Sequence, residues 1–337
     1  MVRTITAALS LALAATTLAT EYTADEIVFE GMTVDQLRAE LPQFEQPDLW
    51  FGGNAPELTI AEWVKGDQIT GFEPGTVYVV EFWATWCGPC IRAFPHLTEL
   101  NKDYGDKVEV IGVNIWERSE GEARAKAVRD FVASQGERMG YTVALEEGTS
   151  MSESWMRPAN RNGIPSAFIV DQQGDIAWMG HPMAMDEPLE QIVAGEYNSA
   201  EAAKTSADEQ MLQGRLQYVL EKIDKGDADR GYALLKTMID RELGSNPGML
   251  NQLAWVTLKN PQIPARDPDF SLRAAQKAAE LTEHKNADVL DTLAHALAAT
   301  GNKGKAIEMI NKAIELAESD EQRENYISSR NEFQNAG

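Results

Sequence analysis

The chain has 337 residues and a formal net charge of −23, from 53 acidic and 30 basic side chains. A surface of that sign repels phosphate groups, which argues against nucleic-acid binding. The length favours two domains, and the 43% hydrophobic content is ordinary for a globular protein.

The first 19 residues have the pattern of a secretory signal peptide. Arg3 precedes an apolar run rich in alanine and leucine, Ile5 to Ala19, which ends in small residues. The run has about 15 residues, whereas a membrane-spanning helix needs roughly 20. We therefore predict cleavage near Ala19, export to the periplasm or another extracytoplasmic space, and no membrane span after cleavage.

Residues 20–54 form a predicted acidic extension to which we assign no activity. From Glu21 to Glu62 there are ten acidic residues and one basic residue, Arg38. Residues 34–41 are compatible with a short helix, and prolines and glycines interrupt the rest. We expect the extension to lie over the domain that follows it, or to be partly disordered.

The two cysteines of the chain lie between a predicted strand and a predicted helix. Val77 to Trp83 is a β-branched and aromatic run typical of a buried strand, and residues 89–100 show helical spacing of apolar side chains. Cys87 is therefore expected at a helix N-terminus, where unpaired amides and the helix dipole favour a thiolate. Cys90 lies one turn deeper, placed to attack a mixed disulfide on Cys87.

The two residues between the cysteines fit this chemistry. Gly88 keeps the approach to the Cys87 sulfur open, and Pro89 suits the first helical turn, where its missing N–H is no loss. We expect Gly88, Pro89 and Trp86 to contact the substrate.

Two other uses of the cysteine pair are less favoured. A structural disulfide would close a loop of four residues and would constrain the unfolded chain by only about 2 kcal/mol. A zinc site needs a second ligand pair, and the four histidines, at positions 96, 181, 284 and 295, are too scattered to supply one. We predict a redox-active disulfide, Cys87–Cys90, with no metal and no other cofactor.

The segment Phe82-Trp83-Ala84-Thr85-Trp86-Cys87-Gly88-Pro89-Cys90 resembles the active-site segment of thioredoxin-fold proteins. Its wider context, from about residue 55 to about residue 197, resembles the extracytoplasmic TlpA-type thiol:disulfide oxidoreductases. The resemblance implies an α/β thioredoxin-like domain at residues 55–198, with a central mixed sheet and helices on both faces. It also implies that the Ile164–Pro165 peptide bond is cis and pairs the backbone beside the dithiol with an incoming substrate strand.

The remaining elements of this domain follow in alternation, as a covered sheet requires. We predict a strand at 108–114, a charged helix at 121–139, a strand at 142–145, a short helix at 150–160, and a hairpin of strands ending at 179.

Glu81 interrupts the otherwise apolar strand, six residues before Cys87. Alternation allows it to point beneath the active-site helix, where burial would raise its pKa and let it accept the proton of Cys90. Its position matches the buried aspartate of thioredoxins, which implies the same role; the alternative is a strand residue that faces solvent. His96 and His181 are weaker candidates for proton carriage.

Residues 199–208 have no large apolar side chain and are assigned to a linker. Residues 209–337 resemble tetratricopeptide-type helical repeats, with a first pair turning at Gly226 and a final helix at 321–333. Apolar and small residues recur in the last pair at Leu290, Leu293, Ala294, Leu297, Gly301, Ala306, Ile310 and Ala313. We expect a stack that binds a protein or peptide partner, or a packing or dimerisation module.

The residues and the resemblance together predict an exported thiol:disulfide oxidoreductase that reduces or reshuffles disulfides of other exported proteins. The Gly88-Pro89 pair resembles that of reducing thioredoxins, and the family implies a membrane-embedded thiol reductant as electron donor. A redox sensor or scaffold is one alternative. A thiol peroxidase is less favoured because Thr85 lies two residues before Cys87, where that motif needs three.

Overall fold

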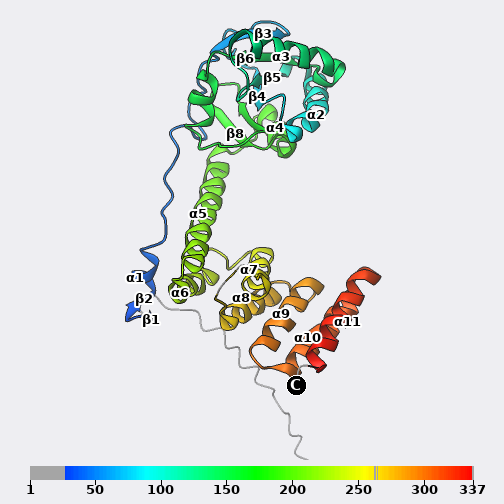
Figure 1. The fold of residues 1–337 in the computed structure, drawn as a ribbon. Coiled ribbons are helices and arrows are strands. Elements are labelled where there is room, and N and C mark those ends of the chain that lie inside the picture. Colours follow the sequence, from blue (N-terminus) through cyan, green and yellow to red (C-terminus); the bar gives the residue numbers. More distant parts are fainter. Residues whose placement is uncertain (1–26, 262, 264, 336–337) are drawn as a thin grey trace, which may run out of the picture. The chain divides into compact units, whose positions relative to one another are not determined.

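The computed structural model describes residues 27–261, 263 and 265–335, so the predicted signal peptide lies outside the described part (Figure 1). The chain divides into two units: Phe44–Gln210 forms one, and the segments before and after it form the other. Within the described residues, no helix has the length and apolar character needed to cross a membrane.

The first unit is built on a six-stranded mixed sheet with the order β3-β6-β5-β4-β7-β8. Strands β4, β5 and β6 run parallel, whereas β3, β7 and β8 are antiparallel to their neighbours. The strands are β3 (Ile60–Lys65), β4 (Val77–Trp83), β5 (Val108–Asn114), β6 (Thr142–Glu146), β7 (Ser166–Val170) and β8 (Ile176–Gly180). This topology confirms the predicted thioredoxin-like fold.

Both faces of the sheet are covered, because the alternate side chains of β4 enter two different cores. Val79 and Trp83 face helices α2 (Gly88–Tyr104), α3 (Gly121–Gln135) and α4 (Asp186–Ala194). Val80 and Phe82 face the opposite core, with Trp50 and with Trp155 from a short π-helical turn, Ser152–Met156. The central strand is therefore buried over its whole length, including Glu81, the one charged residue in its otherwise apolar sequence.

Helix α2 contains a proline, and an arginine side chain supplies the hydrogen bond that the proline cannot make. Pro95 lies inside the helix and has no N–H to donate to the carbonyl of Ile91. Instead, Arg138 Nη2 donates to that carbonyl oxygen at 3.0 Å. The helix thus continues to Tyr104 despite the missing backbone bond.

The second unit contains consecutive helices that pack against one another (Figure 1). They are α6 (Ala228–Ile239), α7 (Pro247–Lys259), α8 (Pro268–Leu281), α9 (Ala287–Ala299), α10 (Lys303–Leu316) and α11 (Asp320–Asn335), after α5 (Ser199–Asp224). Asn246, Asp267, Asn286 and Asn302 cap the starts of α7 to α10 by accepting from backbone N–H groups. Gly226, at a φ of 96°, makes the predicted turn between α5 and α6.

The predicted linker is helical. Residues 199–208 form the first turns of α5, and the Asn198 side chain accepts from the backbone N–H of Glu201 at 3.1 Å. Ala203 and Ala207 pack against the core of the first unit. The boundary between the two units, at Gln210, falls just after these residues, and their alanines favour the helix because alanine is the best helix former.

The prediction that the acidic extension lies over the following domain is wrong for its first described part. Helix α1 (Val34–Arg38), preceded by the short strands β1 (Ile27–Phe29) and β2 (Met32–Thr33), belongs to the second unit. Leu37 and Leu41 are buried in the helical core. Ion pairs join this segment to the helices of the second unit. Arg38 and Arg215 both contact Glu242, and Arg230 contacts Glu40.

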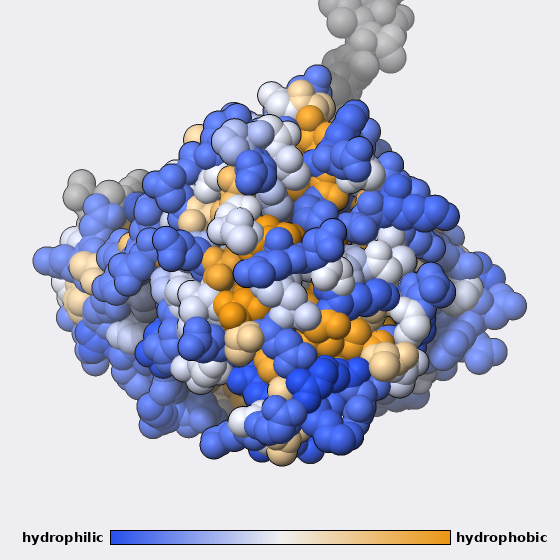
Figure 2. Space-filling model, turned by 90° about the horizontal axis from the view of Figure 1, so that it is seen from above, coloured by the Kyte–Doolittle hydropathy of each residue, from blue (hydrophilic) through white to orange (hydrophobic). Residues whose placement is uncertain are grey.

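The surface seen in Figure 2 is largely hydrophilic, with apolar patches between the charged side chains. In the first unit, the large hydrophobic side chains that are exposed are Trp86 and Met183. Trp86 directly precedes Cys87, so an exposed aromatic ring accompanies the cysteine pair.

Candidate active site

Cys87 and Cys90 form a disulfide at the N-terminus of α2. Cys87 is the N-cap residue, and its Sγ accepts from the backbone N–H of Cys90 at 3.2 Å. Cys87 is 3% exposed and Cys90 is fully buried, in the predicted order. The positive end of the helix therefore lies at the sulfur of Cys87, where it stabilises a thiolate.

The loop before Cys87 is held by a glutamate that the sequence analysis missed. Glu117 accepts from the backbone N–H of Thr85 at 2.6 Å and from the Thr85 hydroxyl at 2.8 Å. It also accepts from Asn114 Nδ2, at the end of β5, at 2.8 Å. Glu117 follows a strand in a charged stretch, so nothing in its local sequence distinguishes it from a solvated residue.

Trp86 is 44% exposed, and its indole N–H donates to the carbonyl of Trp116 at 2.9 Å. The guanidinium of Arg118 lies 5.8 Å from the centre of its ring. Trp83, in contrast, is fully buried under the active-site loop. The two tryptophans of the motif thus have different surroundings, one at the surface and one in the core.

The Ile164–Pro165 peptide bond is cis, which confirms the predicted geometry. Both residues line a pocket of about 490 Å³ together with Pro89, Gly163, Gly180 and His181. The structure thus brings the predicted residues Pro89, Ile164 and Pro165 together at one surface.

Glu81 lies in the middle of β4 and is fully buried. It shares a face of the strand with Val79 and Trp83, so it points toward the core that contains Cys90. In the described part of the chain, neither carboxyl oxygen has a hydrogen-bond partner. Burial raises the pKa of Glu81 well above its ordinary value, and the alternative of a strand residue facing solvent is excluded.

The two candidate histidines make local contacts. His181 Nδ1 accepts from the backbone N–H of Met183 at 3.2 Å and caps the turn after β8. His96 Nε2 lies 2.8 Å from a carboxylate oxygen of Asp186, at the start of α4. These contacts support structural roles. Among the described residues, no group of three or more histidine, cysteine or acidic side chains is arranged to hold a metal ion.

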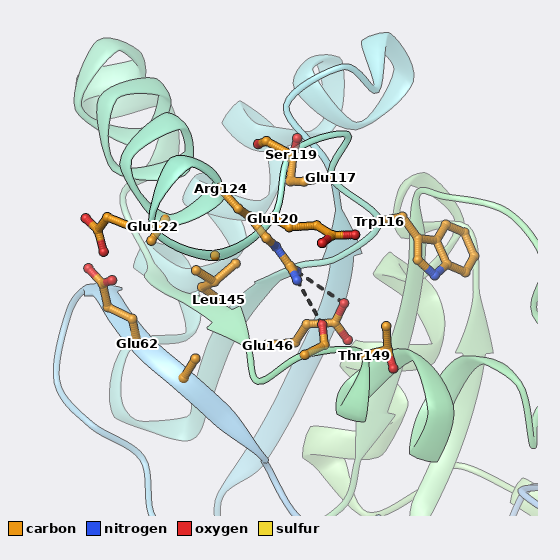
Figure 3. Close-up of a pocket in the computed structure, with 14 residues that line it drawn as sticks. Glu62, Trp116, Glu117, Ser119, Glu120, Glu122, Arg124, Leu145, Glu146 and Thr149 are labelled. Atoms are coloured by element: carbon orange, nitrogen blue, oxygen red, sulfur yellow. Dashed lines mark hydrogen bonds and ion pairs between the residues drawn. The ribbon is translucent and has the colours of Figure 1, made fainter.

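A second pocket, of about 610 Å³, begins at Trp116 and Glu117 and is drawn in Figure 3. Arg124 crosses it and donates to the carbonyl of Gly148 at 2.8 Å and to Glu146 at 3.2 Å. At the other end, Glu62 is bound by Arg129 at 2.7 Å. These ion pairs tie α3 to β3 and β6, so we assign the pocket a structural role beside the active-site loop.

Comparisons with known proteins agree with this geometry. The redoxin family model matches residues 55–190. The chain is 28% identical to protein FixW of Rhizobium leguminosarum over 171 residues, which are 49% of this chain and 76% of that protein. It is 38% identical to thioredoxin-like protein YneN of Bacillus subtilis over 125 residues, 37% of this chain and 68% of that protein. It is 25% identical to thiol-disulfide oxidoreductase ResA of Bacillus cereus over 134 residues, 39% of this chain and 70% of that protein.

Proposed function

This chain belongs to the redoxin family, among the TlpA-type thiol-disulfide oxidoreductases, and we propose that it reduces or reshuffles disulfides of other exported proteins. One observation carries the proposal: the Cys87–Cys90 disulfide caps α2 directly above a core that holds the unpaired carboxyl of Glu81. A nucleophile, a resolving thiol and a proton acceptor are therefore available in one place.

The reaction starts from the reduced protein. The Cys87 thiolate attacks one sulfur of a client disulfide, a mixed disulfide forms, and the first client sulfur leaves as a thiolate. Cys90 then gives its proton to the carboxylate of Glu81 and attacks the Cys87 sulfur. The second client thiolate leaves, so two electrons have passed to the client and the Cys87–Cys90 disulfide has formed.

The surface around Pro165 orients the client. We assign the backbone at Ile164 and Pro165 to pairing with an extended client segment, with Gly88 adding no side chain next to the Cys87 sulfur and Pro89 lining the same surface as Pro165. The exposed ring of Trp86 provides an apolar contact at the opposite side of Cys87. These roles agree with the pocket that Pro89, Ile164 and Pro165 share.

The location and the electron donor are parts of the same proposal. The signal-like pattern of the first 19 residues supports export to the periplasm. A reductase in that compartment needs a supply of electrons, and we propose a membrane-embedded thiol reductant that restores the Cys87–Cys90 dithiol. The cofactor is then the disulfide itself.

Insulin-disulfide reduction by the purified protein tests the proposal. Cys87→Ser is expected to abolish reduction, whereas Cys90→Ser is expected to accumulate mixed disulfides with the client because the resolving thiol is absent. A midpoint potential well below roughly −200 mV for the cysteine pair would support a reductase, and one near −120 mV an oxidant. If the dithiol variants reduced insulin like the wild type, the proposal would be wrong.

The helical unit supports a second candidate, a scaffold or redox sensor that recruits a partner. This unit has its own core, with Leu234, Leu250, Phe270, Leu290 and Ile310 buried. The scaffold function predicts that Cys87→Ser retains activity in the cell, whereas the enzyme function predicts that it is lost. For a deletion of the helical unit, the scaffold function predicts that activity in the cell is lost, whereas the enzyme function predicts that it is retained.

A further inference from the structure

Gly112 leaves a gap in the sheet beside Glu81. It is the residue of β5 that pairs with Glu81 of β4. A Cβ atom at position 112 would lie 2.8 Å from Cε2 of Tyr141 and 3.3 Å from Nε1 of Trp83. The Tyr141 ring therefore lies over β5, in space that any side chain at position 112 would occupy, and on the side that holds the active-site core.

The polar atoms around this gap are buried. Tyr141 is 4% exposed, and within the described residues its hydroxyl has no hydrogen-bond partner. The same holds for the two carboxyl oxygens of Glu81 and for Nε1 of Trp83. Buried polar groups normally have hydrogen-bond partners, so these unpaired atoms beside the cysteine pair need an explanation.

Tyr141 also reaches a pocket at the surface of the unit. This pocket, of about 590 Å³, is lined by Tyr141 and Thr142 together with charged residues at its opening. The hydroxyl of Thr142 donates to a carboxylate oxygen of Glu109 in the same lining, at 2.8 Å. Tyr141 therefore belongs to the buried core and also contributes to the lining of a polar pocket.

We propose that Tyr141 is a positioning residue for Glu81: its hydroxyl donates to the charged carboxylate in the reduced protein and links that carboxylate to the pocket at the surface. This inference rests on the proposed function, in which Glu81 accepts the proton of Cys90. In the disulfide form the carboxyl holds that proton and does not need a donor. In the dithiol form, at a pH above its raised pKa, the carboxyl is charged, and the Tyr141 hydroxyl can donate to it from across Gly112.

The electrostatics agree with this assignment. Burial and the charge of Glu81 raise the pKa of Tyr141 well above its ordinary value, so the phenol keeps its proton and remains a donor. Glu81, Tyr141 and the disulfide-bonded Cys87 and Cys90 lie in or beside this core, Tyr104 and Tyr197 are partly buried at its edge, and His96 of α2 pairs with Asp186 of α4. Lys65, Asp67, Glu109 and Glu137 line the pocket on the other side of Tyr141.

Tyr141→Phe tests the proposal, because it removes one oxygen and keeps the ring over Gly112. The pKa of Glu81 in the reduced protein can be measured by carbon-13 NMR of the glutamate carboxyls, with Glu81→Gln identifying the signal. We expect Tyr141→Phe to raise this pKa by about one unit, a tenfold change, because the charged form loses its donor. The pH profile of insulin reduction should move to higher pH by the same amount.

Tyr78→Phe is the matched control, since Tyr78 is a buried tyrosine that lines the same pocket but belongs to the core on the opposite face of the sheet from Glu81. It should leave the Glu81 titration unchanged. Adding Tyr141→Phe to Glu81→Gln should not change the pH profile further. An unchanged titration in Tyr141→Phe would overturn the proposal, even if insulin reduction were normal. A wild type that titrates as expected but does not reduce disulfides would refute the proposed function and leave the role of Tyr141 intact.

Discussion

At the scale of single residues, the candidate active site contains a carboxyl group in an apolar core. Glu81 has no partner among the described residues, and a charged carboxylate there is costly. The folded protein therefore favours the protonated form, and burial raises the pKa of Glu81 well above 4.5. A group with this property makes the stability of the protein depend on pH.

Glu81→Gln should remove this dependence. Because the folded-state pKa is raised, the contribution of Glu81 to stability is fully present below the unfolded-state pKa and is lost as pH rises through the folded-state value. Between the unfolded-state pKa and the folded-state pKa, the free energy of unfolding of Glu81→Gln should rise relative to that of the wild type by about 1.4 kcal/mol per pH unit. Urea unfolding of both proteins from acidic to alkaline pH measures the difference. Parallel stability curves would contradict the raised pKa.

Glu117 is a second residue that stabilises this site, because its carboxylate joins the active-site loop to the end of β5. Glu117→Ala should lower the free energy of unfolding by about 3 kcal/mol, since three donors lose their acceptor. Glu117→Gln keeps one oxygen and should lose less. Unfolding measurements on both variants, with Glu120→Gln on the neighbouring surface as control, check the order. Equal effects of the alanine and glutamine variants would refute this account.

At the scale of elements, α2 is a helix with one backbone bond replaced by a side chain. Pro95 cannot donate to the carbonyl of Ile91, and Arg138 donates to it from the turn after α3. The helix that presents the dithiol is thereby tied to the segment that precedes β6 and contains Tyr141.

A double-mutant cycle tests this replacement. Arg138→Ala should lower the free energy of unfolding by about 1 kcal/mol in the wild type. In Pro95→Ala the effect should be smaller, because residue 95 then donates its own N–H to Ile91. Arg157→Ala, which removes an exposed ion pair with Glu153, is the control and should have little effect. Additive effects of the first two substitutions would contradict the exchange of donors.

At the scale of the whole molecule, two units with separate cores are formed by segments that are not contiguous in the sequence. The segment before residue 44 contributes Leu37 to the helical core, whereas Leu49 and Trp50 enter the core of the oxidoreductase unit. The chain between Leu37 and Leu49 therefore passes from one unit to the other.

Leucine-to-alanine substitutions can separate the two cores. Leu37→Ala should destabilise the helical unit by about 2–5 kcal/mol, and Leu49→Ala should do the same to the oxidoreductase unit. Hydrogen exchange resolved by segment measures each unit in one experiment. Insulin reduction should persist in Leu37→Ala. Loss of protection in the oxidoreductase unit of that variant would show that the cores are not independent.

The sequence by itself determined the features that depend on local pattern. The β-branched run of β4, the cysteines at a helix start and the successive helices after residue 209 follow from residue types and spacings over a few turns, whereas the cis bond before Pro165 was implied only by the resemblance to thioredoxin-fold proteins. An error came where composition was used in place of pattern. The first described part of the acidic extension was expected over the oxidoreductase domain, whereas its residues before Phe44 belong to the helical unit.

The tertiary structure alone decided which distant residues meet. Glu117 reaches Thr85 across 32 positions, and Tyr141 lies over Gly112 beside Glu81. Such contacts depend on strand order and register, which bring β4, β5 and β6 side by side and have no local signature. The environment of Glu81 was likewise decided by the tertiary structure. Alternation along a strand places a residue on one of two faces, and only the packing of other elements on both faces excludes water from Glu81.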